Sequence, residues 1–125
     1  MTLITDIAHW LISHGYGTAL GTDIFSYHLD PSPDNLILII PRSGRPPDQE
    51  MGGTAVDYPS VDIHVRNTSK AQAEAKAEAI RQTLDGETIN GATFWDSRSF
   101  TQFIEKDSSN RYRFMISFDV TKERI

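Results

Sequence analysis

The sequence predicts an α+β fold in which two helices pack on one face of a mainly antiparallel sheet. Two segments, residues 3–14 and 69–84, carry apolar residues at helical spacing. Most of the remaining chain shows short apolar runs or apolar–polar alternation, which are typical of strands. Because 125 residues are the size of one domain, we expect residues 1–125 to share a single core.

The first predicted element is an amphipathic helix over residues 3–14. Thr2 stands where an N-cap belongs, and Gly15 stands where a left-handed C-cap belongs. His14, in the last turn, would meet the negative end of the helix dipole, and we prefer this role to that of a metal ligand. The predicted buried stripe consists of Leu3, Ile4, Ile7, Ala8, Leu11 and Ile12.

Two strands are predicted next, and we expect them to be antiparallel neighbours. Residues 24–29 alternate between apolar and polar side chains. Residues 30–35, DPSPDN, have the composition of a turn. Residues 36–40, LILII, form an unbroken apolar run, which favours a central strand covered on both faces.

A long Pro/Gly-rich loop or flexible arm is predicted over residues 41–59. This span, PRSGRPPDQEMGGTAVDYP, contains four prolines and three glycines, which disfavour regular structure. Connections in compact domains usually run about 4–6 residues, and longer ones tend to be functional or disordered. We therefore expect this segment to contact a partner.

A strand that passes directly into a helix is predicted over residues 58–84. The helix begins at Ser69, with Gln72 at capping-box spacing, and Gly86 closes it. Two alanines in the buried stripe of the helix allow close approach, which predicts that the helix lies close to the sheet. The strand's apolar face is Val61, Ile63 and Val65, and its polar face is Asp62, His64 and Arg66. The helix's buried stripe is Ala73, Ala77, Ile80 and Leu84.

Three strands are predicted in the C-terminal part. The pair Asn90–Gly91 is a strong turn signal. Residues 92–96 and 99–105 are strand-like, and residues 107–110 form a polar turn. The last strand is expected to be a major core contributor, through Tyr112, Phe114, Ile116, Phe118 and Val120 on one face.

Composition excludes several classes of function. Twelve Lys and Arg against seventeen Asp and Glu give a net charge of −5, which disfavours a general nucleic-acid binder. The absence of cysteine excludes disulfides, thiolate zinc sites and thiol nucleophiles. We expect neither a signal peptide nor a membrane span, because no basic leader precedes an apolar run and no run approaches about 18 residues.

The sequence predicts no catalytic residue, metal site or cofactor, and it disfavours an enzyme. The four histidines have no metal-ligand spacing, and no G-x-S-x-G motif occurs. Residues 15–21, GYGTALG, follow a helix, which is the wrong order for a phosphate-binding loop, so we interpret them as a connector. Asp62 and His64 would lie about 7 Å apart on one strand face. A solvated or interfacial sheet face is the preferred interpretation, and a metal-assisted hydrolase is an alternative.

Six segments, in their order and spacing, resemble one family over nearly the whole chain. They are IFSYHLDPSPDN, LILIIP, GRPPD, YPSVDIHVRNTSKAQAEAKAEAI, INGATFW and RYRFMISFDVTKE. This succession is similar to the tail terminator proteins of long-tailed bacteriophages, also labelled minor capsid or tail completion proteins.

The resemblance implies a virion structural protein without catalysis or cofactor. It implies a homo-oligomeric ring, usually a hexamer, that caps the tail tube and offers a joining surface to the head-side connector protein. DNA would pass through the lumen without specific binding. The implied location is the head-proximal end of the phage tail, and the host cytoplasm during assembly. A related head–tail joining or head completion protein, and a small cytosolic protein-binding module, are alternatives.

The predicted partner-binding or subunit-interface residues lie in the proline-rich segment and on the polar face of the strand that follows it. Ring contacts are heterologous, and long arms and strand edges are natural suppliers of such contacts. The predicted residues are Arg42, Arg45, Asp48, Glu50, Asp57, Asp62, His64 and Arg66.

Overall fold

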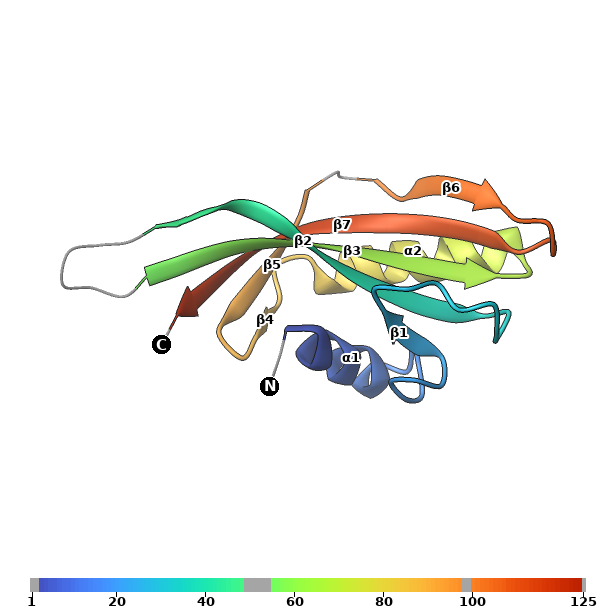
Figure 1. Cartoon of the computed structure of the whole chain (residues 1–125), viewed down its shortest axis with the longest axis horizontal. Helices are drawn as coiled ribbons and strands as arrows, with labels where there is room; N and C mark the ends of the chain where they lie inside the picture. Colours follow the sequence, from blue (N-terminus) through green and yellow to red (C-terminus); the bar gives the residue numbers. More distant parts are fainter. Residues whose placement is uncertain (1–2, 49–54, 98–99, 125) are drawn as a thin grey trace.

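A sheet of seven strands and two helices form the described part of the chain (Figure 1). The structure is a computed structural model that describes residues 3–48, 55–97 and 100–124, with side chains outside the description at 43–48, 55–57 and 123–124. The strand order is β1-β2-β3-β7-β5-β4, and β6 also pairs with β7. The elements are α1 (Leu3–Ser13), β1 (Ile24–Ser26), β2 (Leu36–Asp48), β3 (Ala55–Asn67), α2 (Lys70–Leu84), β4 (Thr88–Ile89), β5 (Ala92–Asp96), β6 (Gln102–Lys106) and β7 (Tyr112–Arg124).

Both helices pack on the same face of the sheet, as the sequence predicts. Buried residues of α1 and α2 belong to one hydrophobic cluster with the inward residues of β2, β3, β5 and β7. The predicted apolar face of β7 is confirmed, because Phe114, Ile116, Phe118 and Val120 are at most 2% exposed. Every strand pair except β1–β2 is antiparallel. The predicted α+β fold is therefore confirmed.

The C-terminal end of α1 has the predicted glycine cap. Gly15 adopts a φ of 78°, in the left-handed region that glycine tolerates. Its N–H donates to the Ile12 carbonyl at 3.1 Å, and the Tyr16 N–H donates to the Leu11 carbonyl at 2.9 Å. This is a Schellman motif, which satisfies carbonyls that the helix end leaves free. The predicted N-cap, Thr2, lies outside the described residues.

Helix α2 follows its prediction residue by residue. The Ser69 hydroxyl accepts from the Gln72 N–H, which caps the first turn. Gly86, with a φ of 84°, follows the C-cap at Asp85. The predicted stripe is confirmed, since its four members are fully buried: Ala73, Ala77, Ile80 and Leu84.

Strand β1 differs from its prediction in length and direction. It ends at Ser26, and it runs parallel to β2, with Ile24 opposite Ile37. The expectation of an antiparallel pair is wrong because residues 27–35 do not form a tight hairpin turn. The chain leaves β1 at Tyr27, which has a φ of 68°, and crosses back to the starting end of β2. The prediction that residues 36–40 form a strand inside the sheet is confirmed, because β2 lies between β1 and β3.

The predicted irregular loop over residues 41–59 is wrong in most of its length. Strand β2 continues to Asp48, and β3 begins at Ala55, so residues 49–54 are the part outside the described chain. Prolines are compatible with this strand for two reasons. Beyond Ile39 no described strand pairs with the outer edge of β2, so a missing N–H there breaks no ladder. The register also shifts twice, between Arg42 and Arg45 and between Arg45 and Asp48.

The C-terminal strands follow prediction closely. Asn90 and Gly91, with φ values of 47° and 81°, connect β4 to β5 in a tight hairpin turn. Strand β5 has the predicted bounds, and β6 is shorter than the predicted 99–105 segment at its start. The Asn90 amide also donates to the buried Asp6 carboxylate at 2.9 Å, which ties α1 to this hairpin.

Candidate interaction surface

A paired extension of β2 and β3 projects past the helices at one end of the molecule (Figure 1). We call β2 residues 41–48 and β3 residues 55–60 the arm. The C-terminal end of β7 supports it as a third strand, since residues 55–57 pair with residues 122–124. Three paired strands are stiffer than an isolated hairpin, which is only marginally stable in water. The sequence therefore builds a projection of paired strands where an irregular loop or flexible arm was expected.

The eight predicted interface residues divide between the arm and the outer face of β3. Arg42, Arg45 and Asp48 lie on β2, and Asp57 lies on the β3 side of the arm. The side chains of Arg45, Asp48 and Asp57 are not described, and Glu50 lies outside the described residues. The remaining three, Asp62, His64 and Arg66, follow along β3.

Arg42 and Asp62 meet at the base of the arm. Their Nε and Oδ2 atoms are 2.8 Å apart. The Ser117 hydroxyl of β7 donates to the other Asp62 oxygen at 2.7 Å. Two residues further along the same pair of strands, toward the arm, the Ser60 hydroxyl of β3 donates to Asp119 of β7 at 3.0 Å. These contacts cross β2, β3 and β7, and they fix the direction in which the arm leaves the body.

His64 contacts an arginine, and its Nδ1 atom lies 3.3 Å from Nη1 of Arg113. Because a guanidinium only donates, Nδ1 is the acceptor and the imidazole is neutral. Burial, and then the charge of Arg113, lower the pKa of His64 from 6.5 to about 4, although Asp62 and Glu105 oppose this. The side chain is 7% exposed. Of the two alternatives for this face, solvated or interfacial, the solvated one is therefore wrong at His64, and the interfacial one stays a prediction.

Acid should destabilise the protein through His64. Between pH 6.5 and about 4 the unfolded chain binds a proton at this residue that the folded chain does not, so stability falls as the pH falls through that window. The full effect below pH 4 is about 3 kcal/mol. Urea unfolding of His64→Gln should show a flatter pH profile over this range. The exposed His28→Gln variant should keep the wild-type profile, and equal profiles for all three proteins would contradict the assignment.

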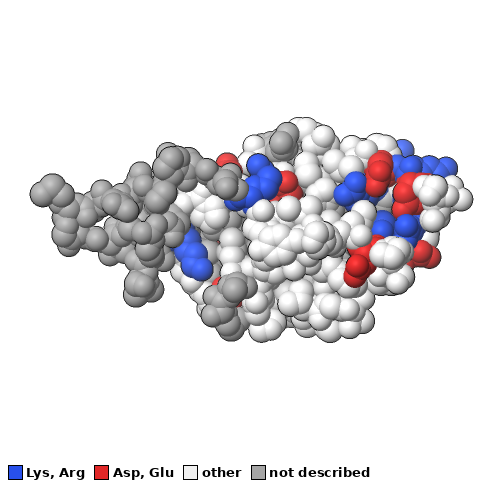
Figure 2. All heavy atoms as spheres, in the orientation of Figure 1, with Lys and Arg blue, Asp and Glu red and all other residues white. Residues whose placement is uncertain are grey.

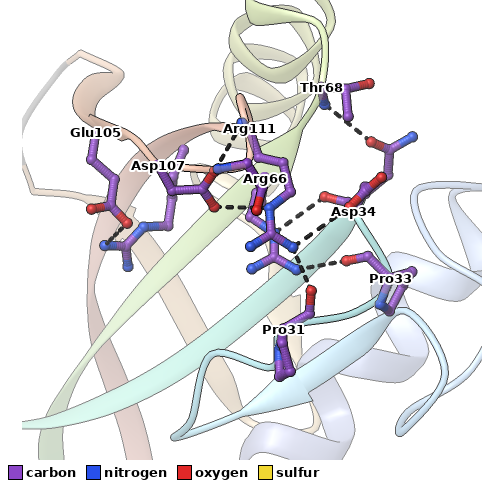
Figure 3. A network of polar contacts seen from close by, with 11 residues as sticks. Pro31, Pro33, Asp34, Arg66, Thr68, Glu105, Asp107 and Arg111 are labelled. Carbon is purple, nitrogen blue, oxygen red and sulfur yellow. Dashed lines mark hydrogen bonds and ion pairs between the residues drawn. The ribbon is translucent and has the colours of Figure 1, made fainter.

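Arg66 anchors the connection between β1 and β2 (Figure 3). It is 2% exposed, and it donates to the carbonyls of Asp34 at 3.1 Å and Pro33 at 2.6 Å. Arg111 donates to the Pro31 carbonyl and pairs with Asp107 at 2.8 Å. Two buried or half-buried cations thus hold residues 31–34, and a solvated Arg66 was a wrong expectation.

Charged residues alternate in sign at the end of the body opposite the arm (Figure 2). Three arginines lie in or next to the ends of β3 and β7 that point away from the arm, and they bond to carbonyls or carboxylates of the chain itself: Arg66, Arg111 and Arg113. Phosphate binding needs cations that are free to exchange counterions for a nucleic acid. This region is therefore a structural network rather than an anion site.

A cleft of about 430 Å³ lies beside α2, and the sequence interpretation missed it. Its wall opposite the helix is formed by residues that precede β6, where Phe100 is 54% exposed. The only signal in the sequence is a second row of alanines, offset from the buried stripe. The lining residues are Ala71, Glu74, Ala75, Glu78, Arg81, Phe100 and Thr101.

One rim of the cleft is a fixed polar network. Arg81 pairs with Glu78, and its Nη1 atom lies 2.6 Å from the Asp96 carboxylate. The Thr101 hydroxyl donates to Glu78 at 2.5 Å. The hydrogen bonds from Arg81, and then from Thr101, lower the pKa of Glu78 to about 2. The carboxylate is therefore ionised at any physiological pH.

Two searches of the described residues for other kinds of site are negative. Among the described side chains, those of residues 3–42, 58–97 and 100–122, no group of three or more His, Asp or Glu could hold a metal ion. Neither described helix has the length and apolar character needed to cross a membrane.

Comparisons with known proteins identify relatives over nearly the full length. Residues 11–124 match the model of a family described as bacteriophage tail terminator protein. A chain from a structure titled "Virion of native gene transfer agent (GTA) particle" shares the fold, with a TM-score of 0.62 at 18% identity. That alignment covers 98% of this chain and 95% of the other. No curated protein matches the sequence.

Proposed function

The chain belongs to the bacteriophage tail terminator family, and from that premise we propose that copies of it close into a ring that caps the tail tube. Family membership itself implies that the chain is a structural protein of a phage tail. We further propose that the ring, usually a hexamer in proteins of this kind, offers a joining surface to the head-side connector. It also places the protein at the head-proximal end of the tail.

The arm is the observation that supports the ring most strongly. A ring needs a heterologous contact, in which one surface of a subunit meets a different surface of its neighbour. A stiff projection at one end of the molecule, fixed at its base by Arg42, Asp62 and Ser117, provides such a surface.

The charge distribution supports a lumen that lets DNA pass. A net charge of −5 gives the phosphate backbone no general attraction. The arginines that the body buries or half-buries are engaged by carbonyls and carboxylates of the same chain. DNA could then move through the ring without displacing many counterions.

Removing the protein from the phage tests the proposal. Electron microscopy of particles made without this chain should reveal tail tubes of uncontrolled length, with no heads attached. Supplying the wild-type chain from a plasmid should restore one tail length and attached heads. Tails of normal length joined to heads, in the absence of the chain, would contradict the proposed function.

A further inference from the structure

The cleft beside α2 arises because the chain leaves the edge of β7 between β5 and β6. Both strands pair with the same edge of β7, and the Ser97 N–H still donates to Ser117 at 3.0 Å. Residues 100 and 101 then stand across from the outer flank of α2. The exposed Ala71 and Ala75 form a shallow apolar floor, and the ring of Phe100 forms a wall. The cleft has a volume of about 430 Å³.

The cleft is acidic. Glu78 and Asp96 share the single guanidinium of Arg81. Glu74, one turn before Glu78, is exposed and pairs with no cation in the described part of the chain. The charged residues that line the cleft are thus two carboxylates and one arginine, and Asp96 shares that arginine from outside the lining. A cationic side chain flanked by apolar groups fits this combination of free charge, small floor and aromatic wall.

The β2 side of the arm has the complementary chemistry. Residues 41–47, PRSGRPP, contain two arginines, three prolines and no acidic residue. Arg42 pairs with Asp62 within the molecule, and Arg45 is the second cationic residue of the segment. Proline rings pack well on aromatic side chains, and their fixed φ lowers the entropy lost on binding.

Strand addition is a poor alternative for this segment. Three prolines leave the outer edge of β2 short of N–H donors, and two register shifts bend it. The segment must therefore be recognised by its side chains. Because the arm projects past its own helices (Figure 1), it does not lie in the cleft beside α2 of its own chain.

We propose that the cleft beside α2 receives residues 41–47 of a second copy of this chain. Arg45 of one copy pairs with Glu74 of the next, and the prolines pack on Phe100 and the two alanines. The arm and the cleft are different surfaces, so the contact is heterologous and repeats around a closed ring. The inference rests on the proposed function, because it identifies the contact that joins neighbouring subunits in the cap.

Disulfide trapping tests the contact directly, because the chain contains no cysteine. Two single variants, one carrying Ser43→Cys and the other Ala75→Cys, are produced together in phage lacking the wild-type gene. The isolated tails are then oxidised. We expect a disulfide-linked dimer on non-reducing gels. The matched control replaces Ala75→Cys by Gln72→Cys, which is exposed on α2 but does not line the cleft. No dimer, or an equal yield with the control, overturns the proposal.

Charge reversal tests the pair that we assign. Glu74→Lys and Arg45→Glu should each lower the yield of the trapped dimer at least tenfold, and their combination should restore it. Glu87→Lys makes the same change of charge outside the cleft and should leave the yield unchanged. Unchanged yields in both single variants overturn the Arg45–Glu74 pair.

The same tails separate this inference from the proposed function. Tails of normal length that carry the cysteine variants but yield no dimer would overturn the contact and leave the cap in place. Normal tails in phage without any copy of the chain would overturn the proposed cap. In that case the trapping is repeated on the purified protein at high concentration, and the absence of a dimer there would overturn the contact.

Discussion

Deleting residues 44–53 should abolish tail capping while the body of the protein stays folded. The deletion removes the outer part of the arm on the β2 side. It leaves the pairing of residues 36–42 with residues 60–66, and it leaves the whole hydrophobic cluster. We expect the free energy of unfolding to change by no more than about 1 kcal/mol, since the change falls in a surface extension. Capping should fall to the level of phage that lack the chain.

A length-matched replacement separates the reach of the arm from its chemistry. Exchanging residues 44–53 for ten Gly and Ser residues keeps the span and removes Arg45 and both neighbouring prolines. We expect this variant to fail as well, because side chains make the contact. Tail lengths are measured by electron microscopy, and unfolding by urea titration. If the deletion variant capped tails as well as the wild-type protein does, the claim that the arm is essential for capping would be wrong.

Phe118→Ala should cause the largest loss of stability, about 3–5 kcal/mol. Phe118 is fully buried, and its ring meets Phe94 edge-on with centroids 6.3 Å apart. It lies opposite Val61 on β3 and Asp96 on β5, at the point where the arm joins the body. The truncation leaves a cavity that surrounding strands cannot fill.

A phenylalanine near the surface serves as the control for this truncation. Phe103 is 48% exposed and meets one ring, that of Phe114. Phe103→Ala should cost under about 1.5 kcal/mol, because less apolar area leaves the core. Denaturant unfolding of both variants measures the difference. Equal losses would mean that the core is not centred on β7 as the packing indicates.

Residues that face one environment were predictable from the sequence. All four residues of the α2 stripe are buried, because that side of the helix lies against the core. On the apolar face of β7, the buried residues are Phe114, Ile116, Phe118 and Val120. Turn chemistry was equally local. Gly15, Gly86 and the Asn90–Gly91 pair take the positive φ values that their positions require.

Features that depend on distant parts of the chain were not predictable. The parallel β1–β2 pair depends on Arg66 and Arg111, which are far along the chain from the connection that they hold. The extension of β2 through three prolines depends on an outer edge that no described strand occupies. The polar face of β3 is buried by side chains from β7, and alternation alone cannot distinguish that from solvent.

The candidate surface was partly anticipated for the same reasons. The proline and glycine content and the length of residues 41–59 predicted a contact segment, whereas the acidic cleft requires α2 and the residues before β6 to meet. The roles of the eight predicted residues in binding a partner stay predictions. Arg42 and Asp62 now have a structural role at the base of the arm, since they pair across β2 and β3.

The most direct measurement is electron cryomicroscopy of the head-proximal end of intact tails. Our account predicts a closed ring of copies of this chain at that position, with the arm of each copy lying against α2 of its neighbour. Density for the chain along the length of the tube, or none at the tail end, would contradict it.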